Sequence, residues 1–266
     1  MMKNILLLVH DDEGQEARLQ AALDLTRALG GHLQCIDVTP FPVIAGDLYA
    51  GFGETAVMLD ERQSEARNKT KISARLAKED VSWDWVDITG EIASCLLKEA
   101  ALADIVVLNR QLDSYPLPDM RTIVGQVLMH ARVPVLAVPQ EVNGFSIKRA
   151  LLAWDGHPSC IATMRACTPL LALAEEVEVL TIKDGSIQAE PSDAARYLSR
   201  HNVHASIRVL NDRLHPADAI IEEEAEQWRA DYIIMGAYGR GRIMETFGGV
   251  TRRLLTRSKR PLILGH

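Results

Sequence analysis

Short apolar runs alternate along the chain with longer amphipathic segments, and the alternation is clearest in the second half. The short runs predict strands near Ala150–Trp154, Val177–Ile182, Val203–Val209, Tyr232–Met235 and Leu262–Leu264. The amphipathic segments predict helices around Ile161–Ala174, Ser192–Arg200, Pro216–Arg229 and Val250–Arg257. Strands that are apolar throughout and alternate with helices favour a doubly wound α/β fold, in which helices cover both faces of a parallel sheet.

The same plan occurs in the first half. Lys3–His10 (KNILLLVH) matches Lys148–Asp155 (KRALLAWD) at an offset of 145, and the run from Ala103 matches the run from Ala230 at an offset of 127. A hydrophobic pattern repeated at this scale indicates a duplicated domain. We therefore predict two tandem domains, at residues 1–143 and 147–266, each with a mainly parallel five-stranded sheet. We expect the two domains to pair within the chain.

The two offsets differ by 18 residues, so the first half carries an insertion. It falls most simply after the second predicted strand, between Pro40 and about Lys78. Its first part, PFPVIAGDLYAGFGETA, is apolar and interrupted by glycine and proline, which is typical of a lid or a packing arm. The linker between the halves, Gln140–Ile147, is short and polar, so we expect the domains to lie side by side.

Charge is distributed unevenly between the halves. Up to Ser146 the chain has 13 Lys and Arg against 21 Asp and Glu, a balance of −8, whereas the remainder has 16 against 15, a balance of +1. An acidic half is a poor partner for polyanions, so we expect no nucleic-acid binding and place any nucleotide in the second half. No apolar run approaches the roughly 20 residues of a membrane span, and we expect a cytoplasmic protein with reduced cysteines and no membrane contact.

The segment from Asp231 to His266 concentrates glycine where a strand should end and a helix should begin. Five glycines, Gly236, Gly239, Gly241, Gly248 and Gly249, fall within fourteen residues, and Arg240, Arg242, Arg252 and Arg253 cluster around this loop. Glycine lets main-chain amides approach a ligand closely, and the amino end of a helix favours an anion. The segment therefore predicts a phosphate site.

Gly236-x-x-Gly239, a gap of eight residues and then Gly248-Gly249-Val250-Thr251 resemble the nucleotide loop of the universal stress protein family, whose usual form is G-x2-G-x9-G-[ST]. The chain departs from that form in two ways. Aligned on the glycine pair, the gap is one residue short; aligned on spacing, Val250 follows the closing glycine Gly249. In either alignment the phosphate-contacting hydroxyl is missing. Thr251 could replace it, or backbone amides could suffice.

The resemblance implies an adenine nucleotide, ATP or ADP, with or without magnesium. It places Asp155 at the family's acidic position after the first strand of the domain, where a carboxylate accepts hydrogen bonds from ribose hydroxyls or an adenine amine. The alternative role of Asp155 is to cap the helix that follows. The nucleotide-binding residues implied are Ala153, Trp154, Asp155, Ile182, Met235, Gly236, Gly239, Gly248, Gly249, Val250 and Thr251.

The first half lacks the glycines of this loop. Asn109–Leu112 occupies the position of the first glycine pair, Arg121–Val124 occupies the position of Gly248–Thr251, and His10 stands in place of Asp155. Side chains there would block the approach of phosphate to the backbone, so we expect the first half to have lost this mode of binding. It serves either as a packing partner or as a pocket for another ligand.

No pattern in the sequence indicates a poised nucleophile, a general base, a P-loop or a metal cluster, so we expect neither catalytic nor metal-ligating residues. The function favoured is that of a stress-response protein that binds adenine nucleotide for a regulatory or binding role, with at most slow hydrolysis. One alternative is a nucleotide-free interaction or small-ligand-binding stress protein. Another is an ATP-dependent enzyme of the adenine-nucleotide hydrolase superfamily. The sequence leaves a homodimer open.

Overall fold

The computed structural model describes residues 1–39, 64–112, 119–185, 187–212, 214–237 and 249–266. The first half contains β1 (Asn4–Val9), α1 (Gln15–Leu29), β2 (His32–Thr39), a helix at residues 64–76, β3 (Ser82–Thr89), α3 (Ile92–Glu99), a 3-10 turn (Ala100–Leu102), β4 (Ile105–Asn109), α4 (Met120–His130) and β5 (Val135–Val138). The second contains β6 (Arg149–Ala153), α5 (Pro158–Leu171), β7 (Glu176–Ile182), α6 (Pro191–Ser199), β8 (Ala205–Leu210), α7 (Ala217–Gln227), β9 (Tyr232–Gly236), α8 (Gly249–Arg257) and β10 (Leu262–Gly265).

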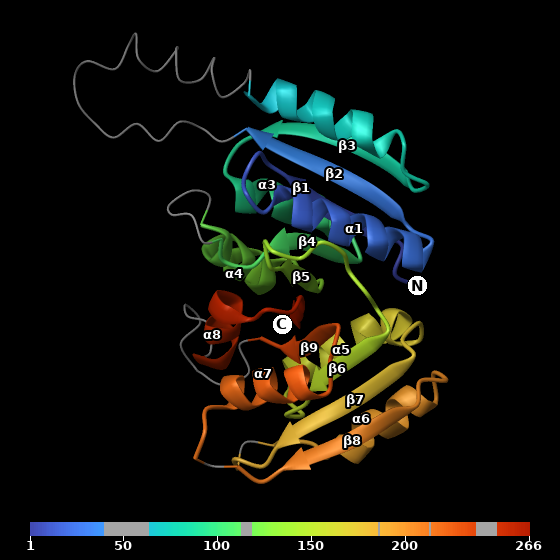
Figure 1. Ribbon diagram of the computed structural model, residues 1–266, viewed down its shortest axis with the longest axis vertical. Helices are drawn as coiled ribbons and strands as arrows, with labels where there is room; N and C mark the ends of the chain where they lie inside the picture. The colour runs from blue at the N-terminus through green and yellow to red at the C-terminus, as the bar shows by residue number, and fades with distance from the viewer. Residues whose placement is uncertain (40–63, 113–118, 186, 213, 238–248) are drawn as a thin grey trace, which may run out of the picture.

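The strands form one sheet of ten, in the order β3-β2-β1-β4-β5-β10-β9-β6-β7-β8. Within each half the strands are parallel, and the order reverses on either side of the first strand of that half, so the predicted doubly wound fold is confirmed. The halves join where β5 and β10 pair antiparallel, with Leu136 opposite Ile263 (Figure 1). The sequence predicted the five strands of each half but not their union in a continuous sheet. The boundaries 1–143 and 147–266 stay a prediction.

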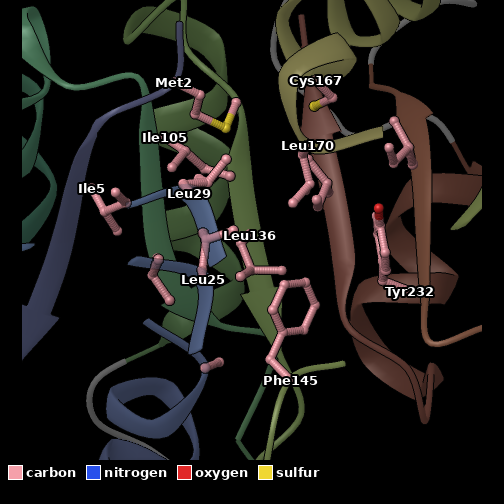
Figure 2. Packing of buried hydrophobic residues seen from close by; sticks show 14 of the residues in the cluster. Met2, Ile5, Leu25, Leu29, Ile105, Leu136, Phe145, Cys167, Leu170 and Tyr232 are labelled. Carbon is pink, nitrogen blue, oxygen red and sulfur yellow. The ribbon is translucent and has the colours of Figure 1, made fainter. Parts of the chain in front are cut away.

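Helices cover both faces of the sheet, as the apolar strands predicted. Alternate residues of β1 enter two different core layers: Ile5, Leu7 and Val9 belong to the layer that contains residues of α1 and α5, whereas Leu6 and Leu8 belong to the layer that contains residues of α3 and α4. The first layer continues across the junction of the halves. Figure 2 shows Leu136 and Phe145 between residues of α1 and Tyr232, and the rings of Phe145 and Tyr232 lie 5.5 Å apart. Burial across the junction therefore ties the halves together.

The observed elements of the second half differ from the predicted ones mainly at their ends. Helix α5 begins at Pro158 rather than Ile161, because proline fits the first helical position, whose amide needs no intrahelical partner. Strand β8 begins at Ala205 rather than Val203, because Asn202 has a positive φ of 61° and the Val203 amide donates back to the Leu198 carbonyl.

The insertion of the first half is described only in part. Its helix at residues 64–76 packs Ile72 and Leu76 into the layer formed with α1. The segment expected to form a lid or packing arm lies outside the described residues. Within the described stretches, every helix is too short or too polar to cross a membrane.

Candidate functional site

The carboxyl ends of β6 and β9 lie next to each other at the point where the strand order of the second half reverses. Ala153, the last residue of β6, is in register with Met235 of β9, and Gly236 then ends β9. Trp154 and Asp155 follow β6 directly. Ligands of open α/β sheets bind at this kind of position. The fold thus brings together five of the residues that the sequence singled out.

Asp155 closes a turn before α5. Its Oδ1 accepts a hydrogen bond from the amide of His157, the residue that precedes the helix, at 3.0 Å. Asp155 therefore does not cap α5, whose N-cap residue is His157 without a side-chain cap; its carboxylate holds the turn that precedes the helix instead. Each carboxylate oxygen can accept more than one hydrogen bond, so a ligand could still bind Oδ2 or share Oδ1.

The loop between β7 and α6 folds back over this turn. The Gln188 amide donates to the Asp155 carbonyl at 2.8 Å, and the indole Nε1 of Trp154 donates to the Ala189 carbonyl at 2.9 Å. Gly156 has a φ of +73°, and a Cβ on it would lie 2.2 Å from the Ala189 nitrogen, so only glycine fits there. Trp154 is 5% exposed, so it forms part of the wall beneath the turn and offers little surface to a ligand.

Close packing explains why residue 236 is a glycine, and the sequence did not reveal this. A Cβ on Gly236 would lie 2.5 Å from the Cys160 nitrogen, so the missing side chain lets the amino end of α5 approach β9. The same Cβ would lie 2.7 Å from the Ser159 hydroxyl oxygen, which is buried and has no hydrogen-bond partner among the residues described. Ser159 is thus a polar group at the strand switch that sequence reasoning missed, and no motif marked it.

Helix α8 begins at Gly249, and its first turn contains three of the predicted residues. Gly249 is exposed, Val250 is half-buried, and Thr251 is only 3% exposed. The Thr251 side chain is therefore buried in this structure, whereas the amides of the first turn carry the helix's unpaired donors. Gly239, Gly248, Arg240 and Arg242 lie outside the described residues.

Arg253 of α8 forms an ion pair with a neighbouring helix. Its Nη2 lies 2.5 Å from Asp218 Oδ1 of α7. The hydrogen bond and charge of that carboxylate raise the pKa of the Arg253 guanidinium further above its ordinary value. The predicted arginine cluster therefore loses part of its charge to an ion pair with α7.

Apolar residues of the site gather on the sheet face that α7 and α8 cover. Ala153, Ile182 and Val250 are each half-buried and pack against the same core layer, and Met235 is buried in it. Leu210 of β8, which pairs in register with Ile182, packs there too and was not predicted. Half-buried apolar residues thus lie at the ends of β6 and β7 and in the first turn of α8.

The thiol nearest the site is unsuited to nucleophilic chemistry. Burial, and then the negative charge of Asp155, raise the pKa of Cys160 to about 12, so the thiol stays protonated at neutral pH. In the described part of the chain, His, Cys, Asp and Glu side chains form no group of three placed to hold a metal ion.

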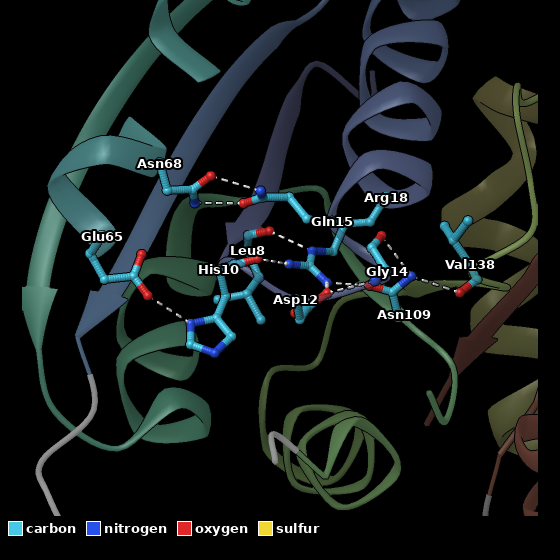
Figure 3. A network of polar contacts seen from close by, with 10 residues as sticks. All are labelled: Leu8, His10, Asp12, Gly14, Gln15, Arg18, Glu65, Asn68, Asn109 and Val138. Carbon is cyan, nitrogen blue, oxygen red and sulfur yellow. Dashed lines mark hydrogen bonds and ion pairs between the residues drawn. The ribbon is translucent and has the colours of Figure 1, made fainter. Parts of the chain in front are cut away.

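The corresponding position of the first half is filled by a side chain of its own. Arg18 is fully buried, and its guanidinium donates to the carbonyls of Leu8 and His10 at 2.8 and 2.9 Å, to Asp12 Oδ1 at 2.9 Å, and to the side-chain oxygen of Asn109 (Figure 3). These contacts lie at the carboxyl ends of β1 and β4. The repeat comparison did not identify Arg18, because a buried arginine on a helix leaves no mark in the hydrophobic pattern.

A second polar group lies beside this network. His10 Nδ1 is 3.1 Å from Glu65 Oε1, and the buried carboxyl of Asp37 on β2 is close enough to Glu65 to be influenced by its charge. Burial, and then the charge of Glu65, raise the pKa of Asp37 to about 7. The group connects the helix at residues 64–76 with the ends of β1 and β2. Where the second half has a site with a carboxylate and glycines, the first half has interlocked polar side chains.

Comparisons with known proteins agree with this geometry. Residues 146–264 match the model of the universal stress protein family. A universal stress protein from Archaeoglobus fulgidus has a similar structure, with a TM-score of 0.76, 15% identity and coverage of 99% of this chain and 96% of that one. A putative universal stress protein and a functionally unknown protein, both from Pseudomonas aeruginosa, each have a TM-score of 0.59 at 15% identity and cover 99% of this chain, with 93% and 92% of their own lengths covered. Likeness at this identity shows the fold. No curated protein matches the sequence.

Proposed function

We propose that the chain is a stress-response protein that binds ATP or ADP in its second half, on the ground that residues 146–264 match the model of the universal stress protein family. Its role is binding or regulation rather than catalysis. The observation that carries this proposal is that Asp155 and Gly236 lie at one strand switch and that α8 is the next described helix after β9, in the half that the family model matches. The proposed localisation is cytoplasmic.

Each part of the site has a task in this proposal. The amides of the first turn of α8 donate to phosphate oxygens, with the helix dipole favouring the negative charge. Asp155 Oδ2 accepts from a ribose hydroxyl while Oδ1 keeps the turn. Ala153, Ile182 and Val250 supply an apolar wall for the base. A magnesium ion accompanying the nucleotide would be bound chiefly by phosphates and water.

Two described groups of the second half bear on whether bound ATP turns over, and neither is poised to react. The Cys160 thiol is protonated at neutral pH. The guanidinium of Arg253, on α8, is already paired with the carboxylate of Asp218. Hydrolysis of bound ATP, if it is measured, should therefore be slow.

Calorimetry on the unaltered full-length chain with ATP, ADP and adenosine tests the proposal. We expect about one site per chain for each nucleotide and weaker binding of adenosine, because adenosine lacks the phosphates that α8 would bind. We also expect poor discrimination between ATP and ADP, at most about tenfold, because the usual hydroxyl is missing and one hydrogen bond contributes roughly 0.5 to 1.5 kcal/mol. Two equivalent sites, or no binding, would contradict the proposal; no binding would favour an interaction module.

A further inference from the structure

The loop after β4 of the first half contacts the end of α8 in the second half. The Gln111 amide donates a hydrogen bond to the Leu255 carbonyl at 3.1 Å. Arg110 Nη1 donates one to the Thr256 carbonyl at 3.3 Å. Leu255 and Thr256 belong to the last turn of α8, a helix of nine residues. This loop is the one that replaces the glycine loop of the second half.

The last carbonyls of a helix have no intrahelical partners, and a cation placed there opposes the negative end of the helix dipole. Arg110 is fixed in this position, because its guanidinium also donates to the Gln111 carbonyl at 2.9 Å and lies 3.3 Å from Glu141. At 6% exposure it is poorly screened by water. A helix as short as α8 depends on such tertiary contacts, because it is too short to be stable alone.

Only the first half has an arginine at this position of the repeat. Arg110 and Ala237 occupy equivalent places in the repeat, because each amide donates to the end of the last strand of its own half, Arg110 to Val138 at 3.0 Å and Ala237 to Gly265 at 2.7 Å. The methyl group of Ala237 cannot donate a hydrogen bond to a carbonyl. The first half therefore supplies the guanidinium of Arg110, and the second half supplies α8, the helix that this guanidinium caps.

We infer that Arg110 is a positioning residue for nucleotide binding: it caps the carboxyl end of α8 and thereby holds the amides of the helix's first turn in place for phosphate. The inference rests on the proposed function and extends it, since it gives the first half a task in the site of the second. A binding surface that is formed only part of the time lowers apparent affinity by the fraction of time that it is formed. Loosening α8 should thus weaken binding of phosphate-bearing ligands.

The test compares Arg110→Met, which removes the charge at similar length, with Arg110→Lys, which keeps the charge. Arg27→Met is the matched control, because Arg27 forms ion pairs with Asp24, Glu79 and Asp80 inside the first half. ATP, ADP and adenosine affinities are measured by calorimetry, and hydrogen exchange of the α8 amides is measured without ligand. We expect Arg110→Met to weaken ATP and ADP binding about two- to tenfold, to leave adenosine binding unchanged and to speed exchange in α8.

Arg110→Lys should have nucleotide affinities and α8 exchange rates between those of the unaltered chain and Arg110→Met. If Arg110→Met does not fold, Arg110→Lys still tests the inference. Arg27→Met should match the unaltered chain in both measurements. Unchanged ATP affinity and unchanged α8 exchange in Arg110→Met would overturn the inference while leaving the proposed function intact. Equal weakening of ATP and adenosine would also overturn it, because the defect would then not be confined to phosphate binding. No binding of ATP by the unaltered chain would overturn the proposed function and, with it, this role of Arg110.

Discussion

At the scale of single residues, the glycines of the second half have different tasks. Gly236 lies where a Cβ would strike the Cys160 backbone at 2.5 Å, whereas a Cβ on Gly249 would meet the end of the flexible Arg253 side chain at 2.9 Å. The sequence marked both as parts of one phosphate loop, because a glycine pattern does not distinguish close packing from ligand access. The structure separates a glycine that packing requires from an exposed glycine at the start of α8.

Two substitutions test this separation. Gly236→Ala should reduce the free energy of unfolding by about 1 to 3 kcal/mol, the range for forcing a carbon into a packed contact. Gly249→Val should change it by less than about 0.5 kcal/mol, as for other surface positions, and should strongly weaken ATP binding. Urea denaturation and calorimetry measure the two effects. Thr122→Val, at the equivalent position of α4, is the control and should leave ATP binding unchanged. Normal stability of Gly236→Ala would contradict the packing argument.

Asp155 can be tested without disturbing its turn. Asp155→Asn keeps an oxygen that can accept from the His157 amide, but it removes the charge. If Oδ2 binds ribose, this variant should fold normally and bind ATP more weakly by about 1 to 3 kcal/mol, the range for a hydrogen bond to a charged group. Calorimetry gives the affinity, and thermal unfolding without ligand gives the control. Full affinity with normal stability would assign Asp155 to the turn alone.

At the scale of elements, the hydrophobic pattern predicted most of the second half to within a few residues. It missed the start of α5 because Pro158 serves as the first helical residue, and the start of β8 because Asn202 adopts a left-handed turn. It could not predict the Arg18 network or the Arg110 contact. Such polar contacts depend on which elements meet in space, and the period of apolar residues along the chain does not contain that information.

We expect the group of Asp37, Glu65 and His10 to make the stability of the folded protein sensitive to pH. The groups that face Asp37 are Glu65, His10 and Asp87, and the folded protein raises its pKa from 3.8 to about 7. A raised carboxyl pKa stabilises the fold fully below about pH 4, and this contribution is lost as the pH rises towards 7. The loss cannot exceed about 1.4 kcal/mol per pH unit.

Asp37→Asn mimics the protonated carboxyl and should remove this dependence. We expect the free energy of unfolding of the unaltered chain, relative to that of Asp37→Asn, to fall between pH 5 and pH 7 and to level off above pH 7. Urea denaturation of both proteins at pH 5, 6, 7 and 8 measures the difference. Parallel pH profiles would show that Asp37 is ionised in the folded state throughout.

At the scale of the whole molecule, the two halves share one strand order but differ in the residues at their strand switches. The first half fills its switch with Arg18 and interlocked polar side chains, and the second keeps Asp155, glycines and the amino end of α8. The sequence predicted this asymmetry from the missing glycines. The antiparallel pairing of β5 with β10 then places the first half's loop against α8.

The central claim is that this chain has one adenine-nucleotide site, in its second half. Native mass spectrometry of the unaltered chain titrated with ATP tests it most directly, because the mass of each species counts the bound nucleotides. The account predicts one nucleotide per chain at saturation, lost in Gly249→Val and kept in Thr122→Val. Two nucleotides per chain, or none at any concentration, would contradict it.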